Sequence, residues 1–379
     1  MFRSFFQGGF EGSSQRRPDM RQLDMIAATQ HDRYAETDYR LLRDAGMLTV
    51  RDALRWHLIE TAPGRYDWSS YLPMLKASQA AGVQVIWDLC HYGLPHDIDI
   101  WSPEFPARFG AFAEAAARVF REHSDTVPFW CPMNEISFWA WGGGDRGYLY
   151  PNAFERGGEL KDQLVRAAIA GIEAARRVDP RARFVQAEPL INIVPDLFKP
   201  EDHGPAEAYR LAQFQAFDML SGRLNPALGG KPEYLDIVGV NYYWDNQWLH
   251  NFWQIGVGHP QYVPPHKLLI EVYERYNRPM LLAETGCESH NGPPWVNYIG
   301  GEIRRALRIG LPIHGICFYP VMDYPGWSDD RHCRVGLIQL DEEYRERRID
   351  RELVLALEEE ALLFEPLLGK TSRMALAAD

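Results

Sequence analysis

VPFWCPMNE, residues 127–135, joins a short apolar run to an Asn-Glu pair. The run 127–133 predicts a buried strand, so Asn134 and Glu135 would lie at its C-terminal end. A carboxylate in such a place is costly unless it is paired or used in chemistry. The stretch therefore predicts a strand that ends in functional side chains.

Further runs of the same kind occur on both sides of this stretch, separated by amphipathic helical segments. The predicted strands are 5–10, 48–53, 83–89, 127–133, 182–187, 235–243, 279–285 and 314–320. Many of the helical segments end in Gly before the next strand, as helix C-caps do. Strands that alternate with helices indicate a parallel α/β architecture, and this number of units favours a single-domain (β/α)8 TIM barrel. We expect the barrel domain to span 1–365, with a last helix over 351–365 and a C-terminal tail over 366–379.

Composition limits the possible partners and the compartment. The 379 residues are 46% hydrophobic and 24% charged, as in ordinary globular proteins, and the net charge of −12 argues against a nucleic-acid partner. No apolar stretch of about 18 residues predicts a membrane span, and the N-terminus lacks the pattern of a signal peptide. An odd number of cysteines without C-x-x-C spacing fits reduced thiols. We therefore expect a cytoplasmic protein with no membrane or nucleic-acid partner, and the sequence does not indicate its oligomeric state.

Polar and aromatic side chains gather at the predicted strand ends, where TIM barrels carry their chemistry. Glu135 ends the fourth strand and Glu284 the seventh. The other candidates at strand ends or in the loops after them are His91, Asn134, Asn241, Tyr243, Tyr319 and Trp327. Two carboxylates across a barrel mouth suit glycosidic bond cleavage, which needs a nucleophile and a protonated acid beside the leaving oxygen. Aromatic faces would pack on sugar C–H groups, and amide or imidazole groups would bind hydroxyls.

These motifs resemble those of the clan A retaining glycoside hydrolases and, within that clan, most resemble the β-glycosidases of family 1. The similar segments run from the first strand to the eighth: GGFEGSSQ (8–15), Val50-Arg51, His91-Tyr92, Asn134-Glu135-Ile136, Asn241-Tyr242-Tyr243 and Ala283-Glu284-Thr285-Gly286. The resemblance implies a retaining β-glycosidase that acts by double displacement through a covalent glycosyl-enzyme on a small glycoside, without a cofactor or metal.

The resemblance also implies roles for individual residues. Glu284 would be the nucleophile and Glu135 the acid/base, while Arg51 and Tyr243 would support the nucleophile. The sugar ligands would be Gln15, His91, Asn134, Asn241, Tyr319 and Trp327. Glu11 and Glu188, at or just past strand ends, are possible further ligands.

The chain departs from the family pattern after the eighth strand. The family has Trp-Ser and then Asp-Asn-Phe-Glu-Trp, whose Glu binds the outer sugar hydroxyls, whereas this chain has YPVMDYPGWSDD (319–330). Tyr319 replaces the first Trp, Gly326 replaces the Glu, and Trp327 remains. The chain is thus expected to be a divergent member whose sugar and linkage the sequence does not identify. Glu11 and Asp329 are the candidates to replace the missing Glu.

Three alternatives remain open at this point. A transglycosylase would use the same intermediate, and a catalytically silent carbohydrate-binding barrel would keep only the binding residues. A metallohydrolase or amidohydrolase would use His31, Asp32, His91 and Glu188, although no H-E-x-x-H or paired Cys/His spacing predicts a metal.

Tryptophans in the predicted loops suggest an aromatic wall for the aglycone or a second sugar. They are Trp139, Trp141, Trp244, Trp248, Trp253 and Trp295. The alternative is that some of them pack the loops onto the barrel.

Overall fold

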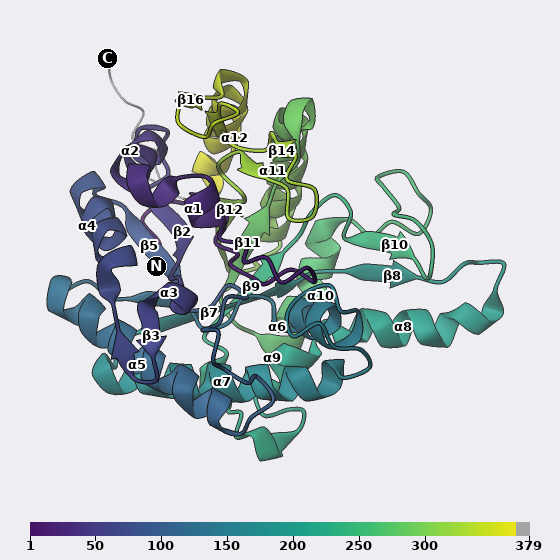
Figure 1. Ribbon diagram of the computed structural model, residues 1–379. Helices are drawn as coiled ribbons and strands as arrows, with labels where there is room; N and C mark the ends of the chain where they lie inside the picture. Colours follow the sequence, from purple (N-terminus) through teal and green to yellow (C-terminus); the bar gives the residue numbers. More distant parts are fainter. Residues whose placement is uncertain (369–379) are drawn as a thin grey trace.

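Eight parallel strands close into a barrel in the computed structural model, which describes residues 1–368 (Figure 1). Their order around the barrel is β1-β12-β11-β9-β7-β6-β5-β2. They are β1 (Phe6–Gly9), β2 (Thr49–Ala53), β5 (Gln84–Asp88), β6 (Phe129–Cys131), β7 (Arg183–Pro189), β9 (Ile237–Asn241), β11 (Met280–Thr285) and β12 (Ile313–Phe318). Each strand overlaps the run predicted for it, so the (β/α)8 barrel is confirmed.

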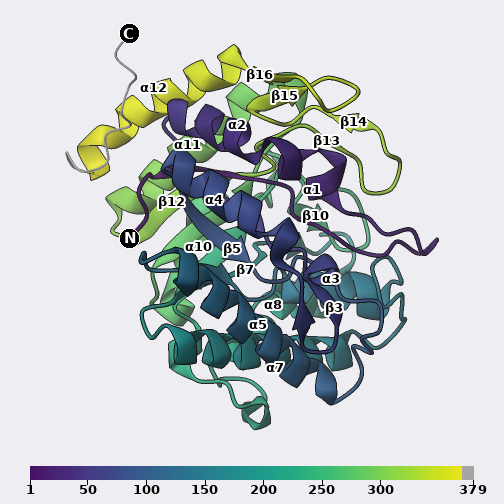
Figure 2. The ribbon, with the colours of Figure 1, turned by 60° about the vertical axis from the view of Figure 1, so that its left-hand side comes forward.

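Helices follow every barrel strand and surround the barrel (Figure 2). The long ones are α2 (His31–Asp44), α4 (Leu72–Ala81), α5 (Glu104–His123), α7 (Gly157–Val178), α8 (His203–Ala212), α10 (Pro265–Tyr276), α11 (Gly292–Arg308) and α12 (Arg351–Leu368). The short ones are α1 (Met25–Ala28), α3 (Trp56–Ile59), α6 (Ile136–Trp139) and α9 (Gln215–Leu220). The first three residues of the expected tail lie in α12, and 369–379 lie outside the described residues.

Alternate residues of each barrel strand contribute to two different apolar cores. In β5, Ile86 joins the cluster inside the barrel, whereas Val85 and Trp87 pack in the larger cluster between barrel and helices. The inner cluster consists of Ile86, Phe129, Cys131, Val185, Ala187, Ile237, Leu281 and Ala283. Burial on both faces explains why these strands are nearly continuous apolar runs in the sequence.

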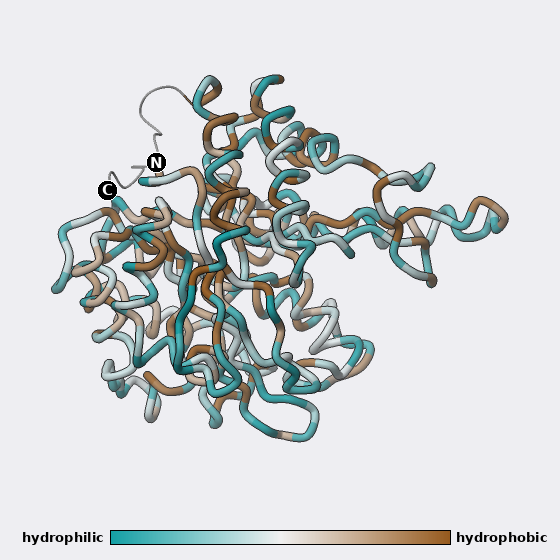
Figure 3. The backbone as a smooth tube through the Cα atoms, turned by 90° about the horizontal axis from the view of Figure 1, so that it is seen from above, coloured by the Kyte–Doolittle hydropathy of each residue, from teal (hydrophilic) through white to brown (hydrophobic). Residues whose placement is uncertain are grey.

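Short two-stranded sheets extend the loops. They are β3 (Glu60–Ala62) with β4 (Arg65–Tyr66), β8 (Asn192–Val194) with β10 (Gln247–Leu249), β13 (Tyr324–Pro325) with β14 (His332–Cys333), and β15 (Ile338–Leu340) with β16 (Arg347–Ile349). The parallel pair β8 and β10, with α8 beside it, forms an arm that projects from the barrel (Figures 1 and 3). No helix within residues 1–368 combines the length and apolar character that crossing a membrane requires.

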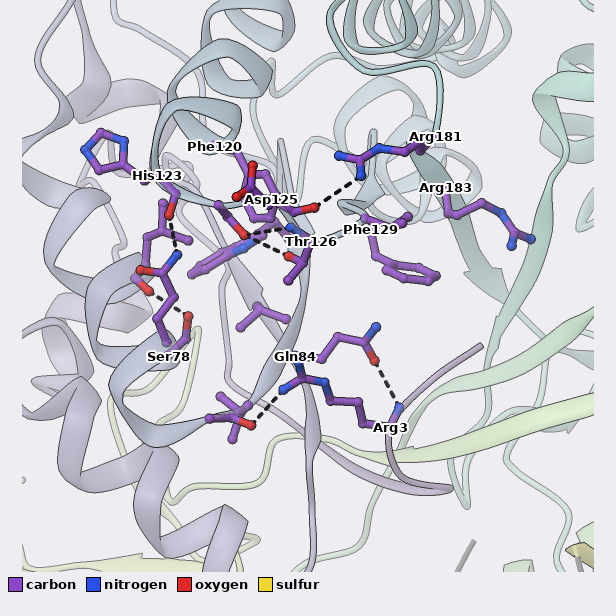
Figure 4. Close-up of a pocket in the computed structure, with 18 of the residues that line it drawn as sticks. Arg3, Ser78, Gln84, Phe120, His123, Asp125, Thr126, Phe129, Arg181 and Arg183 are labelled. Carbon is purple, nitrogen blue, oxygen red and sulfur yellow. Dashed lines mark hydrogen bonds between the residues drawn. The ribbon is translucent and has the colours of Figure 1, made fainter. Parts of the chain in front are cut away.

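A cavity of about 950 Å³ lies at the end of the barrel where the strands begin (Figure 4). Arg3, Arg181 and Arg183 contribute to its lining. Arg181 pairs with Asp179 (2.8 Å), and Arg183 pairs with Asp236 (2.7 Å). Arg3 Nη1 donates to the Gly82 carbonyl (2.9 Å). These guanidinium groups are thus bound by other groups of the chain.

Candidate active site

A second cavity, of about 1020 Å³, lies at the opposite end of the barrel, where the strands end. Several barrel strands, or the loops that follow them, supply side chains to it. These include Glu11, His91, Tyr92, Asn134, Glu135, Tyr243, Glu284, Tyr319 and Trp327. The structure therefore brings most of the predicted site residues to one place. Asn241 and Arg51 are buried beneath them, in contact with the two glutamates.

Glu284 is the last residue but one of β11 and accepts a hydrogen bond at each carboxylate oxygen. Arg51 Nη1 donates to Oε1 (2.6 Å), and the Tyr243 hydroxyl donates to Oε2 (2.9 Å). The Tyr242 hydroxyl instead contacts that of Tyr262 (2.9 Å), away from the glutamate. The carboxylate is thus fixed in direction by a cation and a hydroxyl.

Arg51 on β2 is a fully buried guanidinium that binds Asp88 and Asn134 in addition to Glu284. Its Nε and Nη2 donate to the two oxygens of Asp88 (2.9 and 2.8 Å), and Nη2 also donates to Asn134 Oδ1 (2.6 Å). Burial opposes its charge, but Asp88 and Glu284 outweigh burial and raise the pKa of Arg51 well above its usual range. The sequence pointed to Arg51 but missed Asp88, whose signal was a charged residue near the end of an apolar run.

Glu135 follows β6 in a left-handed backbone conformation (φ 44°) and is the residue just before α6. The Tyr92 hydroxyl donates to its Oε2 (2.7 Å), and Asn241 Nδ2 donates to its Oε1 (2.9 Å). Burial, followed by the charge of Glu284, raises the pKa of Glu135 to about 8. One glutamate of the site is therefore able to carry a proton near neutral pH.

His91 and Asn134 lie between the arginine and the cavity. His91 Nδ1 contacts Asp88 Oδ2 (2.9 Å), and its Nε2 accepts from Asn134 Nδ2 (2.9 Å). The Tyr319 ring lies nearly parallel to the His91 ring, with centroids 6.1 Å apart. Both rings line the cavity.

The first strand places Glu11, and not Gln15, in the cavity. Glu11 is 7% exposed, and its Oε1 accepts from the backbone N–H of Ser13 (3.0 Å) and from the Tyr319 hydroxyl (3.5 Å). Burial raises its pKa. Gln15 is buried outside the cavity lining, so its predicted place among the sugar ligands rests on the resemblance alone.

The loop after β12 brings Tyr324 and Trp327 to the cavity but not Gly326 or Asp329. The Trp327 ring packs edge-on against that of Tyr92, with centroids 5.9 Å apart. Gly326 does not line the cavity, and a Cβ there would come within 2.4 Å of Asp329 Oδ1. Asp329 is exposed and also lies outside the cavity lining.

Glu188 supports the site from below. Its two oxygens accept from the backbone N–H groups of Ile136 and Ser137 (2.9 Å each), and Gln186 Nε2 also donates to it (2.9 Å). Burial raises its pKa to about 6. It does not line the cavity, so its contacts fix the start of α6, directly after Glu135.

The residues of the metallohydrolase alternative lie apart. His31 contacts Asp38 (2.9 Å) and Asp52 (3.0 Å), and Asp32 contacts Arg55 (2.9 Å). Within the described part of the chain, no group of three or more His, Cys, Asp or Glu side chains is arranged to hold a metal ion.

Three of the six tryptophans suggested as an aromatic wall line the cavity: Trp141, Trp248 and Trp253. Sequence reasoning missed the other aromatic residues of this wall, Phe138, Tyr209 and Phe252. The remaining tryptophans have other places. The indoles of Trp139 and Trp295 donate to Tyr150 O (2.6 Å) and Thr285 Oγ1 (2.9 Å), and Trp244 is 52% exposed.

Comparison with known proteins gives weak sequence matches and a strong structural one. No family model matches the chain. "Beta-glucosidase 11" of Arabidopsis thaliana is 28% identical over 135 residues, 33% of this chain and 25% of that protein. "Probable inactive beta-glucosidase 14" of Oryza sativa subsp. japonica is 28% identical over 120 residues, 29% of this chain and 22% of that protein. The matched part of the chain thus spans about a quarter of the length of these curated relatives.

Solved structures of a β-glucosidase from Thermotoga maritima match almost the whole chain. The complex of that enzyme with glucoimidazole has a TM-score of 0.75 at 15% identity, covering 95% of this chain and 98% of that one. A structure described as a family 1 β-glucosidase from the same organism has a TM-score of 0.73 at 15% identity, covering 94% and 98%. The chain therefore has the fold of the family 1 β-glucosidases, as its motifs predicted.

Proposed function

We propose that this chain is a retaining β-glycosidase with Glu284 as nucleophile and Glu135 as acid/base. The observation that carries the proposal is the different environment of two carboxyl groups in one cavity. Glu284 is bound by Arg51 and Tyr243, whereas burial and the neighbouring anion raise the pKa of Glu135. This difference in surroundings supports Glu284 as the nucleophile and Glu135 as the acid.

In the first step, Glu284 attacks the anomeric carbon and the bond from that carbon to the aglycone oxygen breaks. The proton of Glu135 passes to the departing oxygen, which leaves a glycosyl ester on Glu284 and an anionic Glu135. In the second step, water attacks the same face that the aglycone left. Its proton passes to Glu135, the ester bond breaks, and the anomeric configuration is retained.

The cavity divides into a sugar region and an aglycone region under this assignment. Glu11, His91, Asn134, Tyr319 and Trp327 would hold the sugar close to the two glutamates. The aromatic wall defined above would face an aglycone or a second sugar through its apolar faces. A sugar hydroxyl that replaced water in the second step would make the same chain a transglycosylase.

The test is chemical rescue of Glu284→Gly. This variant should not turn over any aryl β-glycoside that the native chain hydrolyses, and added azide should restore cleavage of an activated one with a product of inverted configuration. Glu288→Gly is the matched control, because Glu288 follows the same strand but is bound to Arg331 at the surface (2.5 Å). Near-normal turnover by Glu284→Gly would refute the assignment, and a native chain inactive on every glycoside would favour a silent binding barrel.

A further inference from the structure

Tyr92 completes a chain of hydrogen bonds that joins the two carboxylates of the site. Its hydroxyl donates to Glu135 Oε2 (2.7 Å) and accepts from Asn134 Nδ2 (3.1 Å). Asn134 Oδ1 accepts from Arg51 Nη2 (2.6 Å). Arg51 Nη1 donates to Glu284 Oε1 (2.6 Å), which closes the path.

Chemistry fixes the direction of each of these hydrogen bonds. Arginine only donates, so the oxygen of Asn134 faces Arg51 and its NH2 group faces Tyr92. The single proton of the Tyr92 hydroxyl is then left for Glu135. Burial raises the pKa of Tyr92 well above its usual range, so this hydroxyl keeps its proton and remains a donor.

The backbone and the packing hold Tyr92 in this position. Tyr92 (φ 68°) and Glu135 (φ 44°) both have left-handed conformations, which are unfavourable for non-glycine residues and persist only where the surroundings impose them. The Tyr92 ring is 2% exposed and packs edge-on against Trp139 (5.6 Å) and Trp327 (5.9 Å). The hydroxyl therefore has little freedom to leave Glu135.

The groups that face Glu135 act on its charge in opposite directions. Burial, Glu284 on β11 and Glu188 on β7 disfavour the anion, and the Tyr243 hydroxyl after β9 lies close by. Tyr92 and Asn241 act in the opposite direction, because a hydrogen-bond donor to a carboxylate stabilises its ionised form. Of the two, Tyr92 lowers the pKa of Glu135 more.

We propose that Tyr92 is a positioning residue that holds and stabilises the Glu135 carboxylate as the base of the second step. This inference rests on the proposed function. In that step the water oxygen bonds to the anomeric carbon, the bond from that carbon to Glu284 breaks, and the water proton passes to Glu135. Without the Tyr92 hydroxyl, the carboxylate that receives the proton would be free to turn away from the attacking water.

Tyr92→Phe tests this inference because it keeps the ring and its packing. With a substrate that needs the acid, the alkaline limb of the pH profile of kcat/KM should move up by about one pH unit, because Glu135 would keep its proton to higher pH. With an aryl glycoside that has a good leaving group, kcat should fall by about tenfold or more while kcat/KM changes little, because only the second step needs the base. Azide, which attacks without a base, should restore that kcat.

Tyr298→Phe is the matched control, since Tyr298 also hydrogen-bonds through its hydroxyl (to Tyr262, 2.7 Å) but lies outside the cavity lining. A second readout does not depend on turnover. The Glu135 side-chain carbon is titrated by 13C NMR, with its resonance identified by its loss in Glu135→Gln, and its pKa should rise in Tyr92→Phe. A folded Tyr92→Phe whose Glu135 pKa equals that of the native chain would overturn the inference. A raised Glu135 pKa in a chain without glycosidase activity would instead support the role of Tyr92 and refute the proposed function.

Discussion

Glu11→Gln would show which part of the barrel mouth binds the outer hydroxyls of the sugar. Both protein donors to Glu11, the Ser13 N–H and the Tyr319 hydroxyl, reach its Oε1. Within residues 1–368 no donor binds Oε2, and the side chain lines the cavity. We therefore expect Oε2 to accept a hydrogen bond from one sugar hydroxyl.

The size of the effect follows from the kind of hydrogen bond. A bond to a charged acceptor contributes about 1.5 to 3 kcal/mol, which corresponds to about tenfold to a hundredfold in kcat/KM. Glutamine keeps the shape of the side chain but removes the charge. The kcat/KM of Glu11→Gln should therefore fall by most of this factor with the unmodified glycoside. It should fall hardly at all with an analogue that lacks the bound hydroxyl.

The assay compares the native chain with Glu11→Gln on a series of substrates, as in a double-mutant cycle in which a deoxy sugar takes the place of the second mutation. The kcat/KM of an aryl β-glycoside and of its 2-, 3-, 4- and 6-deoxy analogues is measured for the native chain and for Glu11→Gln. For one hydroxyl position, the kcat/KM of the parent glycoside should exceed that of the deoxy analogue by about tenfold or more in the native chain. The same ratio should be much smaller in Glu11→Gln. Asp329→Asn, at an exposed site outside the cavity, should leave all ratios unchanged. Equal ratios in the native chain and Glu11→Gln at every position would refute the reasoning.

Three further predictions concern the acid, the arginine and a buried histidine. Glu135→Gln should slow glycosides with poor leaving groups far more than activated aryl glycosides, and equal losses on both would assign the acid role elsewhere. Arg51→Met should lower the free energy of unfolding in urea by about 3–5 kcal/mol, because Asp88 and Glu284 would stay buried without their cation; an unchanged unfolding midpoint would contradict this. The two carboxylates that flank His31 outweigh its burial and raise its pKa to about 9, so its stabilisation is complete below pH 6.5 and lost as the pH rises through 9. The free energy of unfolding should fall by roughly 3 kcal/mol over that range, and His31→Gln should lack this fall.

The fold could be predicted from the sequence because both faces of each barrel strand are buried. Residues such as Val85, Ile86 and Trp87 are all apolar although they point to different cores, so the strands appear as short continuous runs. Their ends could be located less well. β6 covers only 129–131 of the predicted 127–133, because the flanking residues bend away to join the loops.

The position of the two glutamates at the barrel mouth could also be predicted, since each lies near the end of an apolar run. The residues that hold them could not, because their partners are distant in the sequence. Asp88 and Arg51 meet across neighbouring strands, and the Tyr92 hydroxyl reaches Glu135, 43 residues further along the chain, with both backbones in the left-handed conformation. Neither fact can be deduced from residue types or spacing.

The turn after β1 and the residues that follow β12 pack against each other. Gly9 pairs with Arg51 in the barrel, and a Cβ at Gly9 would come within 2.2 Å of the Tyr319 ring, so the ring occupies space that only a glycine leaves open. From there the Tyr319 hydroxyl accepts from the Gly12 N–H (3.1 Å) and reaches Glu11. The strand ends at Gly9, and it is therefore Glu11, two residues further, that enters the cavity, whereas Gln15 lies beyond the turn. Since Gly326 and Asp329 lie outside the cavity lining, we expect the carboxylate that binds the outer sugar hydroxyls to be Glu11, from the turn after β1.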